Sequence, residues 1–525
     1  MDYTVAPTSA LPASIGNVTG HQIPHLAVHK PKNLEEIRAL VASARERKVA
    51  LYPSSTGLNW GYGSSSPATA GCEWVDLSGM NRILNADSIS RSNPIAVIEP
   101  GVTQGQLYDF LQKKCPDLTF NVTGSARHTS IIGNALDRGV GYFGPRKEDL
   151  FGLEVVCGSG EVLKTGFRRL GEDSPLAHSH PFGLGPMLDG LFFQGNFGIV
   201  TSACFKLQPK RPKGVAVFLA LNDNSKIGHF IDELGHLKRE GLMTSVAHIA
   251  NKARSQASLM SGMVDYFERV CKFPADKAKA EAEKALPIIA PNEWTSLSAI
   301  TGNADQVKAA LKEIRQRMKG LARVKVITDE LLNTGYKVTN ALRFLPIGRS
   351  FAAAISATRP LHGLSLGVPT DAAIDNLLWK YGRRDLKAVE FDASNCGLMF
   401  ISPALPPNGT LIIKLIDGMN AVAAKFGQTL YITINIETPT SFVAVINILF
   451  DRSSPAETDN AHHCAHALYK EIKSKAHRLD VYRARTDAMA EIVSGDPHYW
   501  KIVRDIKLAL DPDNIIAPGR YNLPQ

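Results

Sequence analysis

The chain has 525 residues, of which 44% are hydrophobic and 21% charged, values that are usual for a folded globular protein. This balance excludes wholesale disorder, a collagen-like protein and a disulfide-stapled scaffold, and the length predicts more than one domain. The net charge of +9 is mild for this length, and without a long Lys/Arg run it does not indicate nucleic-acid binding.

The predicted cellular setting is the cytoplasm. The seven cysteines, an odd number scattered between Cys72 and Cys464, indicate reduced thiols. The N-terminus has an early acid and no apolar run, unlike a signal peptide. The longest apolar stretch, residues 442–450, has the length and β-branched composition of a strand. We therefore expect no membrane association.

The first part of the chain combines short strands with glycine-rich turns. Residues 33–48 are amphipathic, and Asn33 with Glu36 three residues on predicts a capped helix. Further strands, a helix and a hairpin are expected at 49–53, 74–77, 95–101, 104–114 and 153–166. These elements predict an α+β fold.

Three glycine-rich segments indicate an anionic ligand. They span residues 53–63, 124–144 and 182–198. Glycine leaves backbone N–H groups free to approach phosphates, so three such segments in one domain suggest a large phosphate-bearing cofactor. Three unrelated surface loops are the alternative.

A dinucleotide fingerprint occurs at Gly139, Gly141 and Gly144, but its surroundings do not fit. No clear strand leads into it, Pro145 follows at once, and no helix is predicted after it. The βαβ context that gives GxGxxG its meaning is absent, so we do not predict a Rossmann domain.

From residue 208 onward the sequence pattern changes to longer strands that alternate with helices. Residues 208–214, with two prolines among basic residues, resemble a linker. Strands are then expected at 215–222, 323–330, 398–402, 430–436 and 442–450, and helices near 226–239, 276–286, 305–320, 371–380, 410–425 and 457–475. This alternation predicts a ferredoxin-like antiparallel sheet covered by helices.

Six runs of sequence form a recognisable series: PSSTGLNWGYG (53–63), EPGVT (99–103), IGNALDRGVGY (132–142), GLEVVCGSGEVLKTG (152–166), HPFGLGPMLDGLFFQGNFGIVT (180–201) and APGRYN (517–522). In this order they resemble the vanillyl-alcohol oxidase / para-cresol methylhydroxylase family of FAD-dependent enzymes. The resemblance implies an FAD-binding domain at 1–210, an inserted cap domain at 211–475, and a C-terminal segment, 476–525, that returns to the FAD domain.

The same resemblance implies which residues bind FAD. They belong to the glycine-rich runs and the tail: Pro53, Ser54, Ser55, Thr56, Gly57, Gly61, Pro100, Gly101, Gly124, Ser125, Ile132, Gly133, Asn134, Gly139, Gly141, Tyr142, Gly198, Ile199, Val200 and Arg520.

For catalysis, the resemblance implies that Tyr62, Tyr482 and Arg483 hold a para-substituted phenol as its phenolate. Negative charge on the ring oxygen makes hydride loss from the side-chain carbon easier, and one Arg with two phenolic donors favours the charged form. Arg520 would stabilise the reduced flavin. The structural alternatives are a turn-packing role for Tyr62, a surface position for the Tyr482–Arg483 pair, and a simple cap for Arg520.

The chain departs from the family at the acid beside the flavin. Counting from Gly141 places Lys147 there, with Glu148 and Asp149 just beyond. Either acid could serve as base, or neither.

A second departure concerns the covalent link to FAD. Leu398, two residues after Cys396, stands where many members have the linking histidine, so the sequence predicts non-covalent FAD. A tyrosyl link remains the alternative, with Tyr381 and Tyr431 as the cap tyrosines to check.

Other candidate residues carry weaker signals. His462 and His466, four apart on a predicted helix, have a zinc-like spacing, but without a third ligand we predict a solvated face and no metal. His128 could contact a cofactor phosphate or satisfy its own loop, and Glu390 and Glu437 could line the pocket or form structural ion pairs.

The sequence thus predicts an FAD-linked oxidase or dehydrogenase that oxidises a para-substituted phenol through a quinone methide. The expected partners are a small aromatic substrate, dioxygen or another acceptor, and further copies of the chain, with a cytochrome on another chain as an alternative acceptor. Two alternatives stay open: the same fold acting on a 2-hydroxy acid, alcohol or amine, and a non-catalytic flavoprotein subunit.

Overall fold

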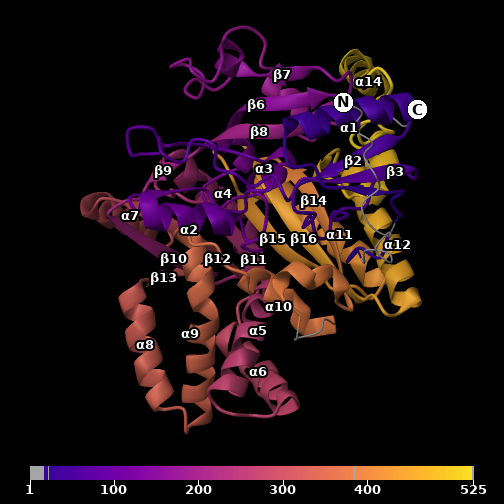
Figure 1. Cartoon of the computed structure of the whole chain (residues 1–525). Helices are drawn as coiled ribbons and strands as arrows, with labels where there is room; N and C mark the ends of the chain where they lie inside the picture. Colours follow the sequence, from indigo (N-terminus) through magenta and orange to yellow (C-terminus); the bar gives the residue numbers. More distant parts are fainter. Residues whose placement is uncertain (1–16, 22, 382–385, 523–525) are drawn as a thin grey trace.

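The computed structural model describes residues 17–21, 23–381 and 386–522. Its helices and sheets are mixed along the chain, as expected for an α+β fold (Figure 1). None of the helices in this part of the chain is both long and apolar enough to cross a bilayer.

A small parallel sheet opens the fold, in the order β1 (Val28–His29), β3 (Cys72–Asp76), β2 (Ala50–Ser54). Helix α1 (Leu34–Arg47) starts where predicted, because the Asn33 side chain accepts a hydrogen bond from the Glu36 amide. Its apolar face, which includes Ile37 and Val41, is fully buried.

A four-stranded antiparallel sheet follows, in the order β4 (Ile95–Ile98), β8 (Gly198–Lys206), β6 (Leu150–Cys157), β7 (Val162–Lys164). The predicted 153–166 hairpin is the β6–β7 pair. Helices α2 (Gln104–Lys114) and α3 (Ile131–Leu136) and the pair β5 (Leu118–Thr119) and β9 (Gln208–Pro209) complete this part.

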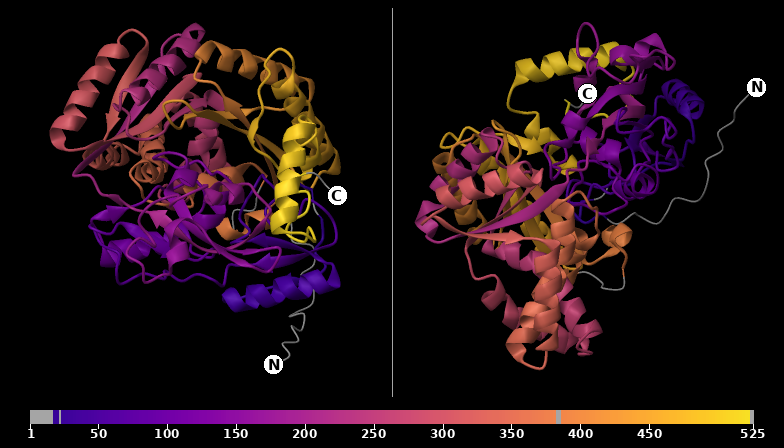
Figure 2. Two further views of the ribbon diagram at one scale, coloured as in Figure 1. Left: turned by 90° about the horizontal axis from the view of Figure 1, so that it is seen from above. Right: turned by 90° about the vertical axis from the view of Figure 1, so that its left-hand side faces the viewer.

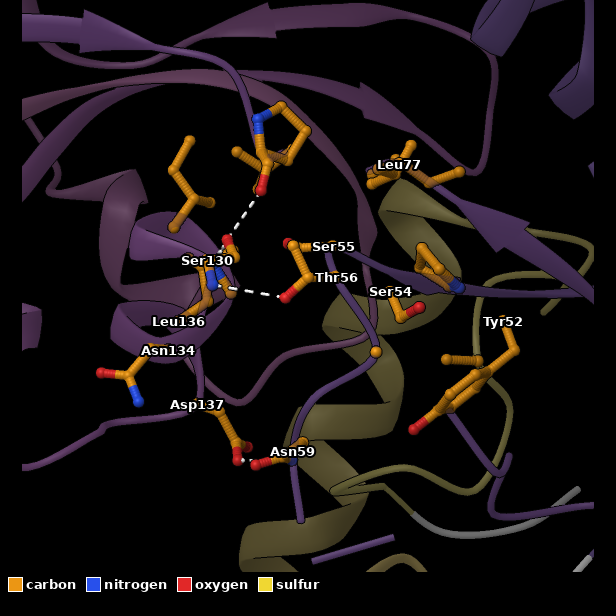
Figure 3. Close-up of a pocket in the computed structure, with 18 of the residues that line it drawn as sticks. Tyr52, Ser54, Ser55, Thr56, Asn59, Leu77, Ser130, Asn134, Leu136 and Asp137 are labelled. Atoms are coloured by element: carbon orange, nitrogen blue, oxygen red, sulfur yellow. Dashed lines mark hydrogen bonds between the residues drawn. The ribbon is translucent and has the colours of Figure 1, made fainter. Parts of the chain in front are cut away.

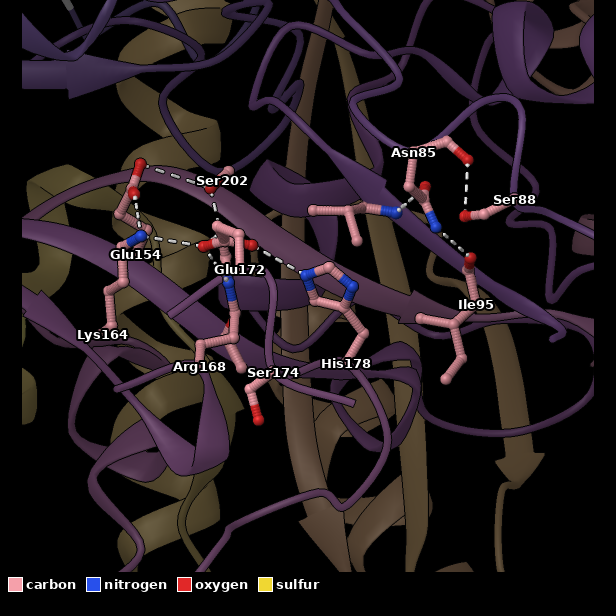
Figure 4. Close-up of polar contacts among 12 residues, drawn as sticks. Asn85, Ser88, Ile95, Glu154, Lys164, Arg168, Glu172, Ser174, His178 and Ser202 are labelled. Atoms are coloured by element: carbon pink, nitrogen blue, oxygen red, sulfur yellow. Dashed lines mark hydrogen bonds and ion pairs between the residues drawn. The ribbon is translucent and has the colours of Figure 1, made fainter. Parts of the chain in front are cut away.

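A cluster of charged side chains holds the segment that follows β7 against this sheet (Figure 4). The Glu172 carboxylate lies 2.8 Å from Arg168, Lys164 and His178. His178 and the two cations hold the pKa of Glu172 well below its usual value, and burial opposes them only in part. Arg168 is itself buried and also donates to the Gly152 carbonyl, so the cluster is structural.

The cap is one eight-stranded sheet. Its order is β13 (Ala322–Ile327), β10 (Lys213–Leu221), β12 (Trp294–Gly302), β11 (Ala247–Asn251), β15 (Tyr431–Ile436), β16 (Phe442–Asp451), β14 (Cys396–Leu405), β17 (Val481–Arg483), all antiparallel. Helices α4 (Ile227–Arg239), α7 (Ala304–Arg317), α11 (Gly409–Lys425) and α12 (Pro455–Lys473) share one apolar core with it.

A helical extension projects from the cap (Figure 1). It contains α5 (Lys252–Arg269), α6 (Ala275–Ile289), α8 (Asp329–Ala341), α9 (Pro346–Ser365) and α10 (Ala372–Tyr381). The sequence missed α5, α8 and α9. Pro360 and Gly363 are unfavourable inside helix α9, yet burial of its alanine-rich face against α5 compensates.

The C-terminal segment joins the two parts (Figure 2). After β17, which extends the cap sheet, come α13 (Met489–Ile492) and α14 (Pro497–Leu510). The chain then returns beside β2, where the Leu51 amide donates to the Ile515 carbonyl at 2.7 Å. Buried Lys507 fixes this return by pairing with Asp511 at 2.5 Å and donating to the Ile516 carbonyl at 2.7 Å.

Candidate active site

A cavity lies where the loop after β2, helix α3, the start of β8 and the C-terminal tail meet (Figure 3). Many of the residues expected to bind FAD line it: Pro53, Ser54, Ser55, Thr56, Gly57, Pro100, Ile132, Gly133, Asn134, Gly198, Ile199, Val200 and Arg520. Residues that the sequence did not single out also line it, among them Tyr52, Asn59, Leu77, Ser130, Asp137, Phe192, Gln194, Asn196 and Ile516.

The chemistry of this lining suits a flavin dinucleotide. Hydroxyl groups of Ser54, Ser55 and Thr56 and several glycine amides offer donors to phosphate oxygens. Apolar side chains, including Leu77 and Phe192, offer walls for rings. Among the described lining residues Asp137 alone has a carboxylate, and that carboxylate is already paired.

Hydrogen bonds hold the loop after β2 close to helix α3. The Ser130 amide donates to Thr56 Oγ1 at 3.3 Å, and Ser130 Oγ donates to the Pro100 carbonyl at 2.6 Å (Figure 3). A Cβ at Gly133 would lie 2.7 Å from Ser55 Oγ, so this approach requires glycine.

Seven predicted cofactor residues lie outside the cavity lining: Gly61, Gly101, Gly124, Ser125, Gly139, Gly141 and Tyr142. Three of the glycines serve close packing inside the protein instead. A Cβ would lie 2.4 Å from the Ser78 carbonyl at Gly101, 2.1 Å from Asn134 at Gly139 and 2.2 Å from Asn121 at Gly141. After the GVGYFG run comes only a short 3-10 turn, Arg146–Asp149, which is not the helix of a Rossmann motif.

The structure brings Tyr62 and Arg483 together. The Arg483 guanidinium carbon lies 3.9 Å from the centre of the Tyr62 ring, a cation–π contact. The Tyr62 hydroxyl is 2.6 Å from Ser402 Oγ, and its ring stacks on Phe400. Because β17 pairs with β14, Arg483 lies opposite Ser402 in the sheet.

Tyr482, the third predicted residue, lies at the same junction. Its hydroxyl oxygen is buried and makes no hydrogen bond within the described part of the chain. Burial raises the pKa of Tyr482, and nearby Glu437 raises it further. A buried hydroxyl without a partner can donate to a ligand at little cost.

Asp137 links the predicted catalytic residues, and the sequence did not identify it. Its carboxylate lies 2.6 Å from Arg483 and 3.0 Å from Arg520, and it accepts a hydrogen bond from Asn59. Burial favours its neutral form, but the two arginines outweigh burial and hold the pKa of Asp137 below its usual value. Arg520 also donates to the Tyr52 hydroxyl at 2.7 Å.

The two acids considered beside the flavin take different positions. Glu148 is exposed, whereas buried Asp149 accepts a hydrogen bond from Asn121 at 2.8 Å. Burial raises the pKa of Asp149 to about 6. Lys147, by contrast, lies over the Tyr482 ring with its ammonium 5.6 Å from the ring centre.

Glu437 is the buried acid at this junction. It directly follows β15, is 2% exposed, and neither carboxylate oxygen has a hydrogen-bond partner among the described residues. Burial raises the pKa of Glu437 to about 8, and Lys147 offsets this only in part. Burial therefore favours the protonated form of Glu437. Glu390, the other candidate on the cap, is exposed.

Three of the residues considered for a covalent link to FAD are buried in the cap. Leu398 is fully buried on β14, and a Cβ at Gly61 would lie 3.2 Å from its Cγ. Cys396 and Tyr431 are buried in the same apolar cluster. Tyr381 ends α10, and its side chain lies outside the described part of the chain.

The histidines of α12 bind separate partners. His462 Nε2 is 2.8 Å from the Thr19 carbonyl, while His463 pairs with Asp459 and His466 with Glu491. In the part of the chain that the structure covers, no group of three His, Cys, Asp or Glu could hold a metal. His128 is exposed and lies outside the cavity lining.

Comparison with known proteins identifies the class. Residues 25–166 match the family model described as "FAD binding domain". The chain is 30% identical to 1'-carboxy-chondrochloren decarboxylase of Chondromyces crocatus, over 96% of this chain and 91% of that protein. It is 28% identical to the 4-cresol dehydrogenase [hydroxylating] flavoprotein subunit of Pseudomonas putida, over 95% and 89%.

Comparison with solved structures gives the same class. The p-cresol methylhydroxylase structure with substrate bound superposes with a TM-score of 0.77 at 25% identity, covering 96% of this chain and 90% of that one. The 4-ethylphenol oxidase of Gulosibacter chungangensis shares the fold, with a TM-score of 0.79 at 24% identity and the same coverage.

Fold, cavity and relatives together define an FAD-dependent oxidoreductase. The chain belongs to the vanillyl-alcohol oxidase / para-cresol methylhydroxylase family of FAD-linked enzymes. The predicted family, α+β fold, FAD cofactor and enzymatic nature are thereby confirmed.

Proposed function

We propose that this enzyme oxidises the side-chain carbon of a para-substituted phenol, which Tyr62, Tyr482 and Arg483 hold as the phenolate. The single observation that carries this proposal is the contact between the Arg483 guanidinium carbon and the Tyr62 ring centre, at 3.9 Å. The preceding residue, Tyr482, has a buried hydroxyl without a hydrogen-bond partner among the described residues. FAD, when bound, supplies the acceptor for the hydride that leaves this carbon.

The charges around Arg483 suit a phenolate. Asp137 is one negative charge between buried Arg483 and half-buried Arg520, so this group keeps one excess positive charge. A phenolate oxygen would compensate that excess and could accept from the Tyr482 hydroxyl. Hydride loss from a phenolate side chain leaves a neutral quinone methide, so no cation forms in the buried site.

The protonated Glu437 would hold a proton beside this site. A carboxyl group that is neutral at pH 7 can donate a hydrogen bond or later release its proton to a reacting group. We propose Glu437, ahead of Glu148 and Asp149, as the acid–base residue, because it is buried and close enough to affect the pKa of Tyr482.

Anaerobic reduction of the bound flavin by a substrate panel tests the proposed function. We expect 4-ethylphenol and 4-hydroxybenzyl alcohol to bleach the flavin, and 2-hydroxy acids and simple amines to leave it oxidised. Reduction by a 2-hydroxy acid or an amine but by no phenol would favour the alternative substrate classes. A flavin that no member reduces would favour the non-catalytic alternative.

The relative named as a decarboxylase adds one class to this panel. Its similarity spans 96% of this chain, and its name specifies a carboxylated compound. Para-phenols with a side-chain carboxylate therefore belong in the panel, with carbon dioxide measured among the products.

We propose that FAD is bound without a covalent link, because leucine at position 398 cannot form one. Precipitating the yellow holoenzyme with acid should release free FAD into the supernatant. Absorbance of pellet and supernatant gives the result. A yellow pellet with a flavin-labelled peptide would refute non-covalent binding and point to a tyrosyl link.

Burial of Glu437 predicts a specific pH dependence of stability. Its pKa is about 8 in the folded protein, against a usual value of 4.5. Between these values the folded state holds a proton that the unfolded state has lost, so stability falls as pH rises through this window. Relative to Glu437→Gln, wild type should lose on the order of 2–4 kcal/mol between pH 5 and 8.

The free energy of unfolding of both proteins, measured by denaturant titration across this pH range, tests the prediction. Parallel pH profiles would show that Glu437 is ionised in the fold, and would remove it as the acid–base residue.

We also propose a cytoplasmic, homo-oligomeric enzyme that passes electrons to dioxygen or to another acceptor. Cys72, Cys115, Cys157, Cys204, Cys271 and Cys464 form no disulfide within the described structure, which supports a reducing compartment. The relative from Pseudomonas putida is named as a flavoprotein subunit, which keeps a separate cytochrome chain among the candidate acceptors.

A further inference from the structure

Two buried hydroxyl groups, those of Tyr62 and Ser402, form a close pair between the loop after β2 and strand β14. The Tyr62 hydroxyl oxygen lies 2.6 Å from Ser402 Oγ. Tyr62 is 4% exposed and Ser402 is fully buried. Within the part of the chain that the structure describes, neither hydroxyl has a second hydrogen-bond partner. Each hydroxyl therefore depends on the other.

Strand β14 fixes the position of Tyr62. Phe400 stacks on the Tyr62 ring with the ring centres 5.1 Å apart, and the Phe400 amide donates to the Gly61 carbonyl at 3.1 Å. Ser402 lies two residues further along the strand, opposite Arg483 of β17. Because alternate residues of a strand share one face, Phe400 and Ser402 reach Tyr62 from the same side of the sheet.

The pair carries two protons but makes only one mutual hydrogen bond, so one proton points away from the pair. Burial raises the pKa of Tyr62 above its usual value, so this hydroxyl keeps its proton at neutral pH. If Ser402 donates to Tyr62, the Tyr62 proton is free for a ligand. If Tyr62 donates to Ser402, the Tyr62 oxygen can only accept.

A phenolate ligand selects the first of these arrangements. A phenolate oxygen has no proton and can only accept hydrogen bonds, so Tyr62 must donate to it. Ser402 then donates to Tyr62, and neither buried hydroxyl is left without an acceptor. Consecutive hydrogen bonds polarise one another, so a Tyr62 hydroxyl that accepts from Ser402 is a stronger donor to the phenolate.

We propose that Ser402 is a positioning residue, whose hydroxyl donates to Tyr62 and directs the Tyr62 proton toward the phenolate oxygen of the substrate. This inference rests on the proposed function, since Tyr62 must contact the phenolate. Ser402 acts through Tyr62 and does not touch the substrate. The sequence did not identify Ser402, because its partner lies 340 residues earlier in the chain.

The pKa of a bound phenol tests the inference. The probe is 4-hydroxyacetophenone bound to the FAD-loaded enzyme, because its side-chain carbon is a carbonyl with no hydride to lose and its phenolate absorbs in the near ultraviolet. We expect wild type to lower the pKa of this phenol below its value in free solution. Ser402→Ala should raise the pKa of the bound phenol by about one unit relative to wild type, which is a tenfold loss of preference for the phenolate.

A double variant shows whether Ser402 acts through Tyr62. Tyr62→Phe removes the hydroxyl that Ser402 contacts, so adding Ser402→Ala to Tyr62→Phe should raise the pKa of the bound phenol no further. Ser298→Ala is the matched control. Ser298 lies on β12 of the same sheet, is 1% exposed, and its hydroxyl has no hydrogen-bond partner in the described structure, so this variant should behave as wild type.

Three results would overturn the inference. They are an unchanged pKa of the bound phenol in Ser402→Ala, a further rise of equal size in the double variant, and loss of FAD from Ser402→Ala. If wild type still lowers the pKa of the phenol in these cases, the proposed function stands and only the role of Ser402 is wrong. If wild type leaves that pKa unchanged and no para-phenol reduces the flavin, the proposed function itself fails.

Discussion

Replacing Arg483 by alanine should slow flavin reduction by a para-substituted phenol by two to three orders of magnitude. Arg483 is 9% exposed and brings a full positive charge to the face of Tyr62. Losing one charged donor from a buried anion site costs about 2–4 kcal/mol of transition-state stabilisation. Stopped-flow absorbance at the flavin band, with 4-ethylphenol under anaerobic conditions, measures the rate.

Two further variants make this result specific. Arg483→Lys should recover only part of the rate, because an ammonium cannot reproduce the planar donor set that binds Asp137 and a phenolate together. Arg91→Ala removes an exposed arginine in a loop and should reduce as fast as wild type. A wild-type rate in Arg483→Ala would leave the arginine a structural role only.

The second large effect is expected at Asp137. Asp137→Asn leaves buried Arg483 and half-buried Arg520 without their shared counter-charge, so stability should fall by about 3–5 kcal/mol. Because Asp137 also lines the cavity that we propose for FAD, affinity for FAD should fall with stability. Denaturant unfolding and equilibrium dialysis of FAD measure the two quantities.

A surface ion pair provides the control for Asp137. Asp109 lies 2.9 Å from Arg127, but its side chain is 66% exposed, so Asp109→Asn should cost less than about 1 kcal/mol. If Asp137→Asn is as mild as this control, the two arginines are neutralised by some other group, and the charge argument for a bound phenolate loses its basis.

Asp137 also shows where sequence reasoning stops. The motif that contains it, IGNALDRGVGY, was recognised, and the loop residues of that motif and of PSSTGLNWGYG line the cavity as expected. Asp137 was overlooked because its role depends on arginines 346 and 383 residues further along the chain. An isolated acid in a glycine-rich run carries no local signal for such a pair.

Glycines show a second limit of sequence reasoning. Gly101, Gly139 and Gly141 were expected to touch the cofactor, and the structure shows that each also leaves room for another part of the protein. A glycine in the sequence indicates that another group packs closely against its backbone, but the sequence does not show whether that group is the cofactor or another part of the protein.

Local patterns predicted most of the cap strands and helices, but missed β11, β12 and β17 as well as α5, α8 and α9. The strand run at 442–450 coincides with β16, because a β-branched apolar run is a strong local signal. Helix α9 was missed because its stability comes from tertiary packing of small residues against α5, which propensity alone does not reveal.

The most direct test of the phenolate mechanism compares a phenol with its methyl ether. 4-Ethylphenol can lose its proton to the site formed by Tyr62, Tyr482 and Arg483, whereas 4-ethylanisole cannot. We expect wild type to reduce its flavin with the phenol at least a hundredfold faster, and Arg483→Ala to lose most of that preference. Equal rates for both compounds in wild type would contradict a bound phenolate.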